Sequence, residues 1–102
     1  MKQDNILSML GLAKRSNNLV SGEFSTEKAI KTGKACLVVV ALDASDNTKK
    51  LFTNKCAFYE VPVFFYSDKE NLGRAIGYQM RTSLAVTDEG LAQALIKKLQ
   101  SI

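Results

Sequence analysis

The sequence predicts an α/β protein, a three-layer α/β/α sandwich built around a four-stranded mixed sheet. Segments with a helical spacing of apolar residues alternate with short β-branched segments along all 102 residues. Such alternation is typical of a sheet with helices on both faces. Residues 36–42 are also continuously apolar, which indicates a central strand covered on both sides. Because no linker or internal repeat interrupts the chain, we expect a single domain over residues 1–102.

The first helix is expected at residues 4–15, where apolar residues recur at the spacing of one buried helical face. That face consists of Ile6, Met9, Leu10 and Ala13, widened by Leu7 and Leu12. A turn at residues 16–18 leads to a short strand at residues 19–21, which ends at Gly22. A second helix over about residues 23–32 would end at Gly33, a residue type common just beyond helix C-termini.

The third helix follows the central strand, and either Asp43 or Ser45 can cap its N-terminus. Its buried positions would be Thr48, Leu51, Phe52 and Cys56. Pro62 prevents the helix from continuing, and residues 63–66 predict another buried strand.

Ser67 and Glu70 have the spacing of a capping box, which predicts a short fourth helix reaching about Gly77. Residues 83–87 predict the fourth strand, and a last helix starts at Asp88. Its apolar stripe consists of Leu91, Ala92, Leu95, Ile96 and Leu99. Right-handed crossovers between these elements would bring several helix N-termini to one edge of the sheet.

The net charge of +4 is confined to one part of the chain. Residues 14–55 hold eight basic groups against four acidic ones, whereas residues 1–13 and 56–102 are each neutral. A localised basic excess is a weak indication of nucleic-acid binding.

Several classes of function are disfavoured by what the sequence lacks. The chain has no His, the commonest general base and metal ligand, and neither a P-loop nor a Gly-x-Ser-x-Gly motif is present. Asp43 and Asp46 are better explained as helix-start residues than as a catalytic pair. Cys36 and Cys56 lie 20 residues apart without a CxxC motif, so we expect two buried, reduced thiols rather than a zinc site or a disulfide. We therefore expect neither an enzyme nor a metal site.

We also expect a cytoplasmic protein that does not enter a membrane. No stretch approaches the roughly 18 consecutive apolar residues of a membrane span. The first 16 residues also lack the features of a signal peptide.

The predicted second helix has one face suited to RNA. At 100° per residue, Phe24, Lys28 and Lys31 lie opposite the face that must be buried. Phe24 is also in the first turn, where free N–H groups favour an anion, so an aromatic ring and two lysines would meet a phosphate and a base there. Alternatively, Phe24 folds over the helix start as a hydrophobic staple and the lysines are only solvated.

The connection at residues 77–82 is a second candidate. Tyr78, Met80 and Arg81 provide groups that can stack on a splayed base and pair with phosphate. The alternative is that these residues are ordinary loop composition.

Five blocks in register resemble the ribosomal-protein superfamily of the L-seven-Ae type, whose members bind kink-turn RNA. The blocks are Gly22-x(5)-Lys28-Ala29-Ile30-x-x-Gly33-Lys34, residues 37–41, Asp43-Ala44-Ser45, Val61-Pro62-Val63 and Leu72-Gly73-x-Ala75-Ile76-Gly77. The bacterial YlxQ branch is especially similar, at residues 10–13, 43–50 and 85–88.

This resemblance implies the same sandwich fold, no cofactor, and RNA binding by the loop after the first strand and the loop before the last strand. By position, Gly22 matches the family glycine beside the RNA backbone, and Lys28 matches a phosphate-contacting lysine. Residues 72–81 match the loop that reads a flipped-out nucleotide. Kink-turn binders carry Gly-x-Asn-Glu where this chain has Gly22-Glu23-Phe24-Ser25, so the specific readout would be lost or altered.

The sequence thus favours a non-enzymatic RNA-binding protein, associated with the ribosome or ribosomal RNA, that acts as a monomer on structured RNA resembling a kink-turn. Its expected RNA-binding residues are Gly22, Glu23, Phe24, Ser25, Lys28, Lys31, Lys34, Gly77, Tyr78 and Arg81. The alternative is an interaction module that docks on a translation or transcription factor through Lys49 and Lys50. A third reading is a small-ligand domain with a pocket at Asp43 and Ser67.

Overall fold

The computed structural model describes residues 4–102, within which nine elements alternate in the predicted order. They are α1 (Asn5–Arg15), β1 (Leu19–Ser21), α2 (Glu23–Lys31), β2 (Leu37–Val40), α3 (Asp46–Tyr59), β3 (Val63–Phe65), α4 (Lys69–Ala75), β4 (Ser83–Val86) and α5 (Glu89–Gln100). The expected alternation is confirmed.

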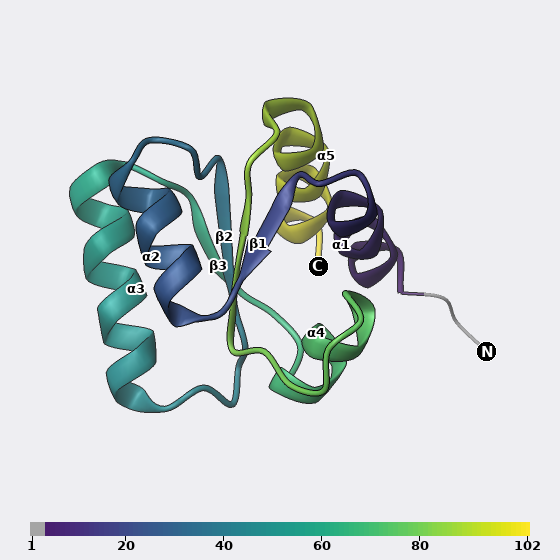
Figure 1. The fold of residues 1–102 in the computed structure, drawn as a ribbon, viewed down its shortest axis with the longest axis horizontal. Helices are drawn as coiled ribbons and strands as arrows, with labels where there is room; N and C mark the ends of the chain where they lie inside the picture. The colour runs from purple at the N-terminus through teal and green to yellow at the C-terminus, as the bar shows by residue number, and fades with distance from the viewer. Residues whose placement is uncertain (1–3) are drawn as a thin grey trace.

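The four strands form one mixed sheet in the order β1-β4-β2-β3. The last strand, β4, is antiparallel to both of its neighbours, whereas β2 and β3 are parallel. Helices α2 and α3 lie on one side of the sheet, and α1, α4 and α5 lie on the other (Figure 1). The predicted α/β/α sandwich is confirmed.

The core lies on both faces of the two central strands, β2 and β4, whose residues are all buried. Each covering helix contributes a side chain with no more than 1% exposure, namely Leu10, Ile30, Phe52, Leu72 and Leu95. Burying such a side chain contributes about 1.5–3 kcal/mol. The apolar run at residues 36–42 is therefore central, as predicted, although Leu42 extends past the sheet and is exposed.

Two sequence predictions of buried apolar residues are wrong. The strand expected at residues 63–66 is β3, an edge strand paired only with β2, and Phe65 is 39% exposed. Leu12, expected to widen the buried face of α1, is 48% exposed.

The N-termini of α1, α3, α4 and α5 are each closed by a short polar side chain, with one correction to the prediction, whereas α2 begins after Gly22 without a side-chain cap. Ser45, rather than Asp43, caps α3 by accepting a hydrogen bond from the Thr48 amide. The expected capping box at Ser67 is not formed, because Asp68 caps α4 and Ser67 lies one residue before that cap with a φ of 60°. Asp43 instead accepts a hydrogen bond of 2.9 Å from the Lys69 amide, which joins the β2–α3 and β3–α4 connections.

Both thiols are free, but only Cys56 is fully buried. Burial raises the pKa of Cys56 to about 11. Cys36 is half-buried, and partial burial and the Glu89 carboxylate both raise the pKa of its thiol. No helix within residues 4–102 has the length and apolar character to span a bilayer.

Candidate nucleic-acid interface

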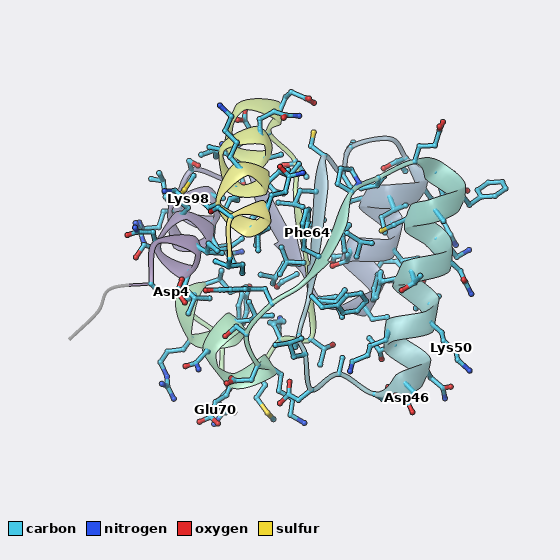
Figure 2. The ribbon with its side chains drawn as sticks, turned by 180° about the vertical axis from the view of Figure 1, so that it is seen from behind. Asp4, Asp46, Lys50, Phe64, Glu70 and Lys98 are labelled. Carbon is cyan, nitrogen blue, oxygen red and sulfur yellow. The ribbon has the colours of Figure 1, made fainter. Side chains whose placement is uncertain are left out.

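The connections that follow β1, β2 and β3 meet the start of β4 at one edge of the sheet. The Gly22 amide donates to the Ser83 carbonyl at 3.0 Å, and the Ala41 amide donates to the Thr82 carbonyl at 2.9 Å. The Arg81 amide similarly donates to the Lys69 carbonyl at 2.9 Å. Figure 2 shows Asp46 and Glu70, from the first turns of α3 and α4, at the same lower edge. The predicted gathering of helix N-termini is confirmed.

Gly22 forms the sharp corner between β1 and α2. Its φ of 92° and ψ of 156° lie in a region that side chains with a Cβ rarely adopt. No atom of the described residues outside its chain neighbours lies within 4 Å of where a Cβ would stand. Its Cα therefore presents an open surface that a ligand backbone can approach closely, beside the unpaired amides at the start of α2.

The two faces of α2 are divided as predicted. Thr26, Ala29 and Ile30 are buried, whereas Phe24 is 79% exposed. The hydrophobic-staple alternative is therefore wrong, and the ring points into solvent. Glu23 and Ser25 are also exposed in this first turn.

The three lysines of this segment differ in position and in partners. Lys28 is exposed and has no carboxylate within 4.0 Å among residues 4–102. Lys31 lies 3.5 Å from the Glu27 carboxylate, which Lys55 also approaches at 3.7 Å. Lys34 follows the C-terminal end of α2, so the length of this helix separates it from Gly22. Of these three lysines, Lys28 is therefore nearest to the sheet edge at Gly22, and Lys34 lies beyond the opposite end of α2.

Arg81 links the α4–β4 loop to the β1–α2 corner. Its Nε donates to Ser21 Oγ at 3.0 Å, and its Nη1 donates to the Met80 carbonyl at 2.9 Å. The guanidinium carbon lies 3.9 Å from the centroid of the Tyr78 ring. This is stacking distance for a cation on an aromatic face. A side-chain network therefore holds this loop against the end of β1.

Tyr78 receives a second cation that sequence reasoning missed. The Lys14 ammonium, from the end of α1, lies 5.3 Å from the ring centroid. Tyr78 and Met80 remain exposed. The preceding Gly77 has a φ of 86°, which turns the chain out of α4. Lys14 belongs to the basic excess of residues 14–55. Its position beside the α4–β4 loop is a tertiary contact that a count of charges along the sequence could not predict.

Gly73 supports the same loop from inside α4. Its carbonyl accepts a 2.8 Å hydrogen bond from the Tyr78 amide. A Cβ at this position would stand 2.7 Å from Met80 Cα and 2.8 Å from the Met80 nitrogen. The loop therefore lies directly on the Gly73 backbone. No cluster of three or more metal-binding side chains is found within residues 4–102.

A known family matches this chain over most of its length. The ribosomal protein L7Ae/L30e/S12e/Gadd45 family matches residues 4–96. The chain belongs to this family. The matched residues run from α1 into α5 and therefore include the β1–α2 corner and the α4–β4 loop. The family expected from the sequence is confirmed.

Two curated relatives represent the expected bacterial branch. RNA-binding protein YlxQ of Bacillus subtilis (strain 168) is 45% identical over 91 residues, which cover 89% of this chain and 91% of that protein. RNA-binding protein YlxQ of Enterococcus faecium is 38% identical over 87 residues, covering 85% of this chain and 84% of that protein. The predicted similarity of this L7Ae-family member to the YlxQ branch is confirmed.

Solved structures of two other proteins have the same fold. A Bacillus halodurans protein of unknown function superposes with a TM-score of 0.93 at 37% identity, covering 96% of this chain and 99% of that one. The 15.5kD RNA binding protein of Giardia lamblia superposes with a TM-score of 0.81 at 20% identity, covering 99% and 92%. The second likeness establishes the fold alone.

Proposed function

We propose that this protein binds structured RNA through the sheet edge formed by the β1–α2 corner and the α4–β4 loop. The bond between Arg81 and Ser21 carries this proposal, because it holds two exposed connections together as one surface. Membership of a ribosomal-protein family, and relatives named as RNA-binding proteins, support RNA as the ligand.

Each side chain at this edge has chemistry that suits RNA. Gly22 admits the RNA backbone, and Lys28 binds phosphate together with the amides at the start of α2. Phe24 and Tyr78 offer rings for unpaired bases, and Arg81 supplies a further cation beside Tyr78. Glu23, Ser25 and Gly77 shape the edge. Lys31, at the end of α2, and Lys34, beyond it, contact phosphates farther from the corner.

The RNA we propose is folded and kink-turn-like, but its base contacts differ from those of kink-turn binders with Asn and Glu. Phe24 and Ser25 occupy those two positions. A phenyl ring stacks but cannot hydrogen-bond a sheared base pair, so stacking and phosphate contacts carry more of the affinity. We further propose that the protein acts without catalysis, as a cytoplasmic monomer on ribosomal RNA or on the ribosome. Its two free thiols are consistent with a reducing compartment.

A titration followed by amide NMR shifts tests the proposal, with a kink-turn hairpin and a plain duplex at two salt concentrations. Shifts confined to residues 22–34 and 77–82 with the kink-turn RNA are expected. Lys28→Ala should weaken binding and reduce the log–log salt slope by about 0.7–0.9. The control Lys97→Ala removes an exposed lysine of α5 and should change neither. Unchanged affinity of the Lys28 variant at low salt contradicts the assignment.

Docking on a translation or transcription factor is the second candidate function, and an exposed aromatic pair favours it. Phe58 is 78% exposed and stacks edge-on against Tyr59, with ring centroids 4.9 Å apart. Both lie at the C-terminal end of α3, the helix that also presents Lys49 and Lys50. This function predicts tight protein binding lost in Phe58→Ser, with RNA binding no better than about 10⁻⁴–10⁻⁶ M at physiological salt.

A further inference from the structure

A groove lies between α1 and α4, on the side of the molecule opposite α2 and α3. It has a volume of about 420 Å³ and is lined by Ser8, Gly11, Arg15, Asn71 and Arg74, among others. The two helices approach closely at Gly11, where a Cβ would stand 2.8 Å from the Ala75 carbonyl oxygen. Glycine at this position therefore sets how near the two walls come.

Two guanidinium groups give the groove its charge. Arg15 Nη1 lies 3.2 Å from the position that a Gly11 Cβ would take, so the guanidinium covers the glycine. No carboxylate within residues 4–102 lies within 4.0 Å of Arg15. Arg74 approaches Glu70 at 3.2 Å, but both side chains are exposed, and such pairs hold their partners weakly. The groove thus presents an uncompensated cation at Arg15 and an accessible one at Arg74.

The groove continues into the proposed RNA-binding loop. Arg74 and its partner Glu70 also line an adjoining hollow of about 470 Å³ together with Tyr78, Gln79 and Met80. Lys14, next to Arg15 in the chain, has its ammonium over the Tyr78 ring. Cations therefore follow one another from Arg81, through Lys14 and Arg74, to Arg15.

The other direction along the same edge carries charges of both signs. Asp43, Asp46 and Asp68 lie at or beside the starts of α3 and α4, together with Lys49, Lys50 and Lys69. In the α1–α4 groove, by contrast, Arg15 has no carboxylate within 4.0 Å among residues 4–102. A polyanion leaving the Tyr78 loop is therefore attracted into the groove by an unpaired cation.

We propose that the α1–α4 groove binds the phosphate backbone of a stem flanking the RNA segment held by the two loops, with Arg15 and Arg74 as its phosphate ligands. Arginine is suited to this role because its planar guanidinium forms paired hydrogen bonds with phosphate oxygens. This inference rests on the proposed RNA-binding function and extends its footprint to residues that the sequence did not single out.

The test compares three RNAs on the full chain: a kink-turn hairpin with long stems, and two versions of it in which one or the other flanking stem is trimmed. The variant carrying both Arg15→Gln and Arg74→Gln should reduce the magnitude of the salt slope by about 1.4–1.8 on the long RNA, for two phosphates. It should leave the slope unchanged on the RNA that lacks the contacting stem. Lys97→Gln, at an exposed α5 lysine, is the control for the loss of one positive charge elsewhere on the surface.

Stability is measured for every variant, because both arginines also lie in the last turns of their helices and compensate helix dipoles. A purely structural role would lower the unfolding midpoint and leave the salt slope on long RNA intact, which overturns the proposal. A double variant that behaves like Lys97→Gln on the long RNA also overturns it. If Lys28→Ala still weakens binding in that case, the loop-mediated function stands. If the unmodified protein binds neither hairpin above the plain duplex, the RNA-binding function itself fails.

Discussion

Replacing Gly73 by alanine should displace the α4–β4 loop, because the loop backbone rests on this glycine. The new Cβ would stand 2.7 Å from Met80 Cα, whereas ordinary contact starts at 3.4 Å. To restore ordinary contact, the loop must therefore move by about 0.7 Å, the difference between these distances. Overpacking of this kind costs about 1–3 kcal/mol. The alanine regains about 1 kcal/mol of helix propensity, which leaves a net loss of roughly 0–2 kcal/mol.

Gly90→Ala is the matched control, since it places the same methyl group in a helix with room for it. The nearest atom to that Cβ is Asp88 Oδ2 at 3.4 Å, so this variant should gain up to about 1 kcal/mol. Urea unfolding of both variants should therefore differ by roughly 1–3 kcal/mol. Amide spectra should show shifts at residues 77–81 in Gly73→Ala alone, with weaker RNA binding. Equal stabilities and an undisturbed loop would refute the reasoning.

The remaining predictions concern strain and titration elsewhere. In Gly22→Ala the new Cβ meets no neighbouring atom within 4 Å, so the variant loses stability only through backbone strain at a φ of 92°. Urea unfolding should show a loss of about 1–3 kcal/mol. An unchanged unfolding midpoint would contradict this. Burial, and the 2.7 Å hydrogen bond donated to Asp4, raise the pKa of Tyr66 to about 12 from its ordinary 10.0. The neutral phenol therefore stabilises the fold fully below pH 10.0, and this stability is lost as the pH rises through about 12. Tyr66→Phe should start less stable at neutral pH and converge with the unmodified protein in this window, whereas parallel curves would argue against the bond. Because burial raises the pKa of Cys56 to about 11, a thiol reagent at pH 8 should modify Cys36 first and Cys56 only after unfolding, as counted by mass spectrometry; equal rates in the folded protein would show that Cys56 is accessible.

The sequence predicted those features of the fold that depend on local spacing. Apolar periodicity correctly divided α2 into a buried face with Ile30 and an exposed face with Lys28. It could not predict that β3 lies at the edge, because strand order depends on pairing between distant segments. It also misplaced the cap of α4, since Ser67 and Asp68 are both good capping residues. The start of α4 also receives a hydrogen bond from outside its own segment. The Lys69 amide donates to Asp43 of the β2–α3 connection, a tertiary contact that local residue spacing cannot predict.

The candidate site was predictable in outline from the family resemblance. That resemblance implied RNA binding by the loop after the first strand and the loop before the last strand, which contain Gly22 and Tyr78, but it did not show that the two loops touch. Their link through Arg81 and Ser21, 60 residues apart, is a tertiary contact. Residues 56–102 have no net charge, so a count along the sequence gives no sign of a basic surface there. In the structure, however, Arg74 of this segment and Arg15 line the same groove. The roles of these residues in RNA binding remain predictions.

The position of β4 in the sheet has a consequence for how the protein is made. This strand is the last in the chain, yet it lies between β1 and β2 and is the partner to which β1 pairs. While the chain is being synthesised, β2 and β3 can pair and α3 can cover them, but β1 has no neighbour until Ser83–Val86 have left the ribosome. The Gly22 amide gains its hydrogen-bond acceptor, the Ser83 carbonyl, in the same step. A nascent chain therefore lacks the proposed binding edge until its last strand is in place, and truncation before β4 removes the whole edge rather than one wall of it.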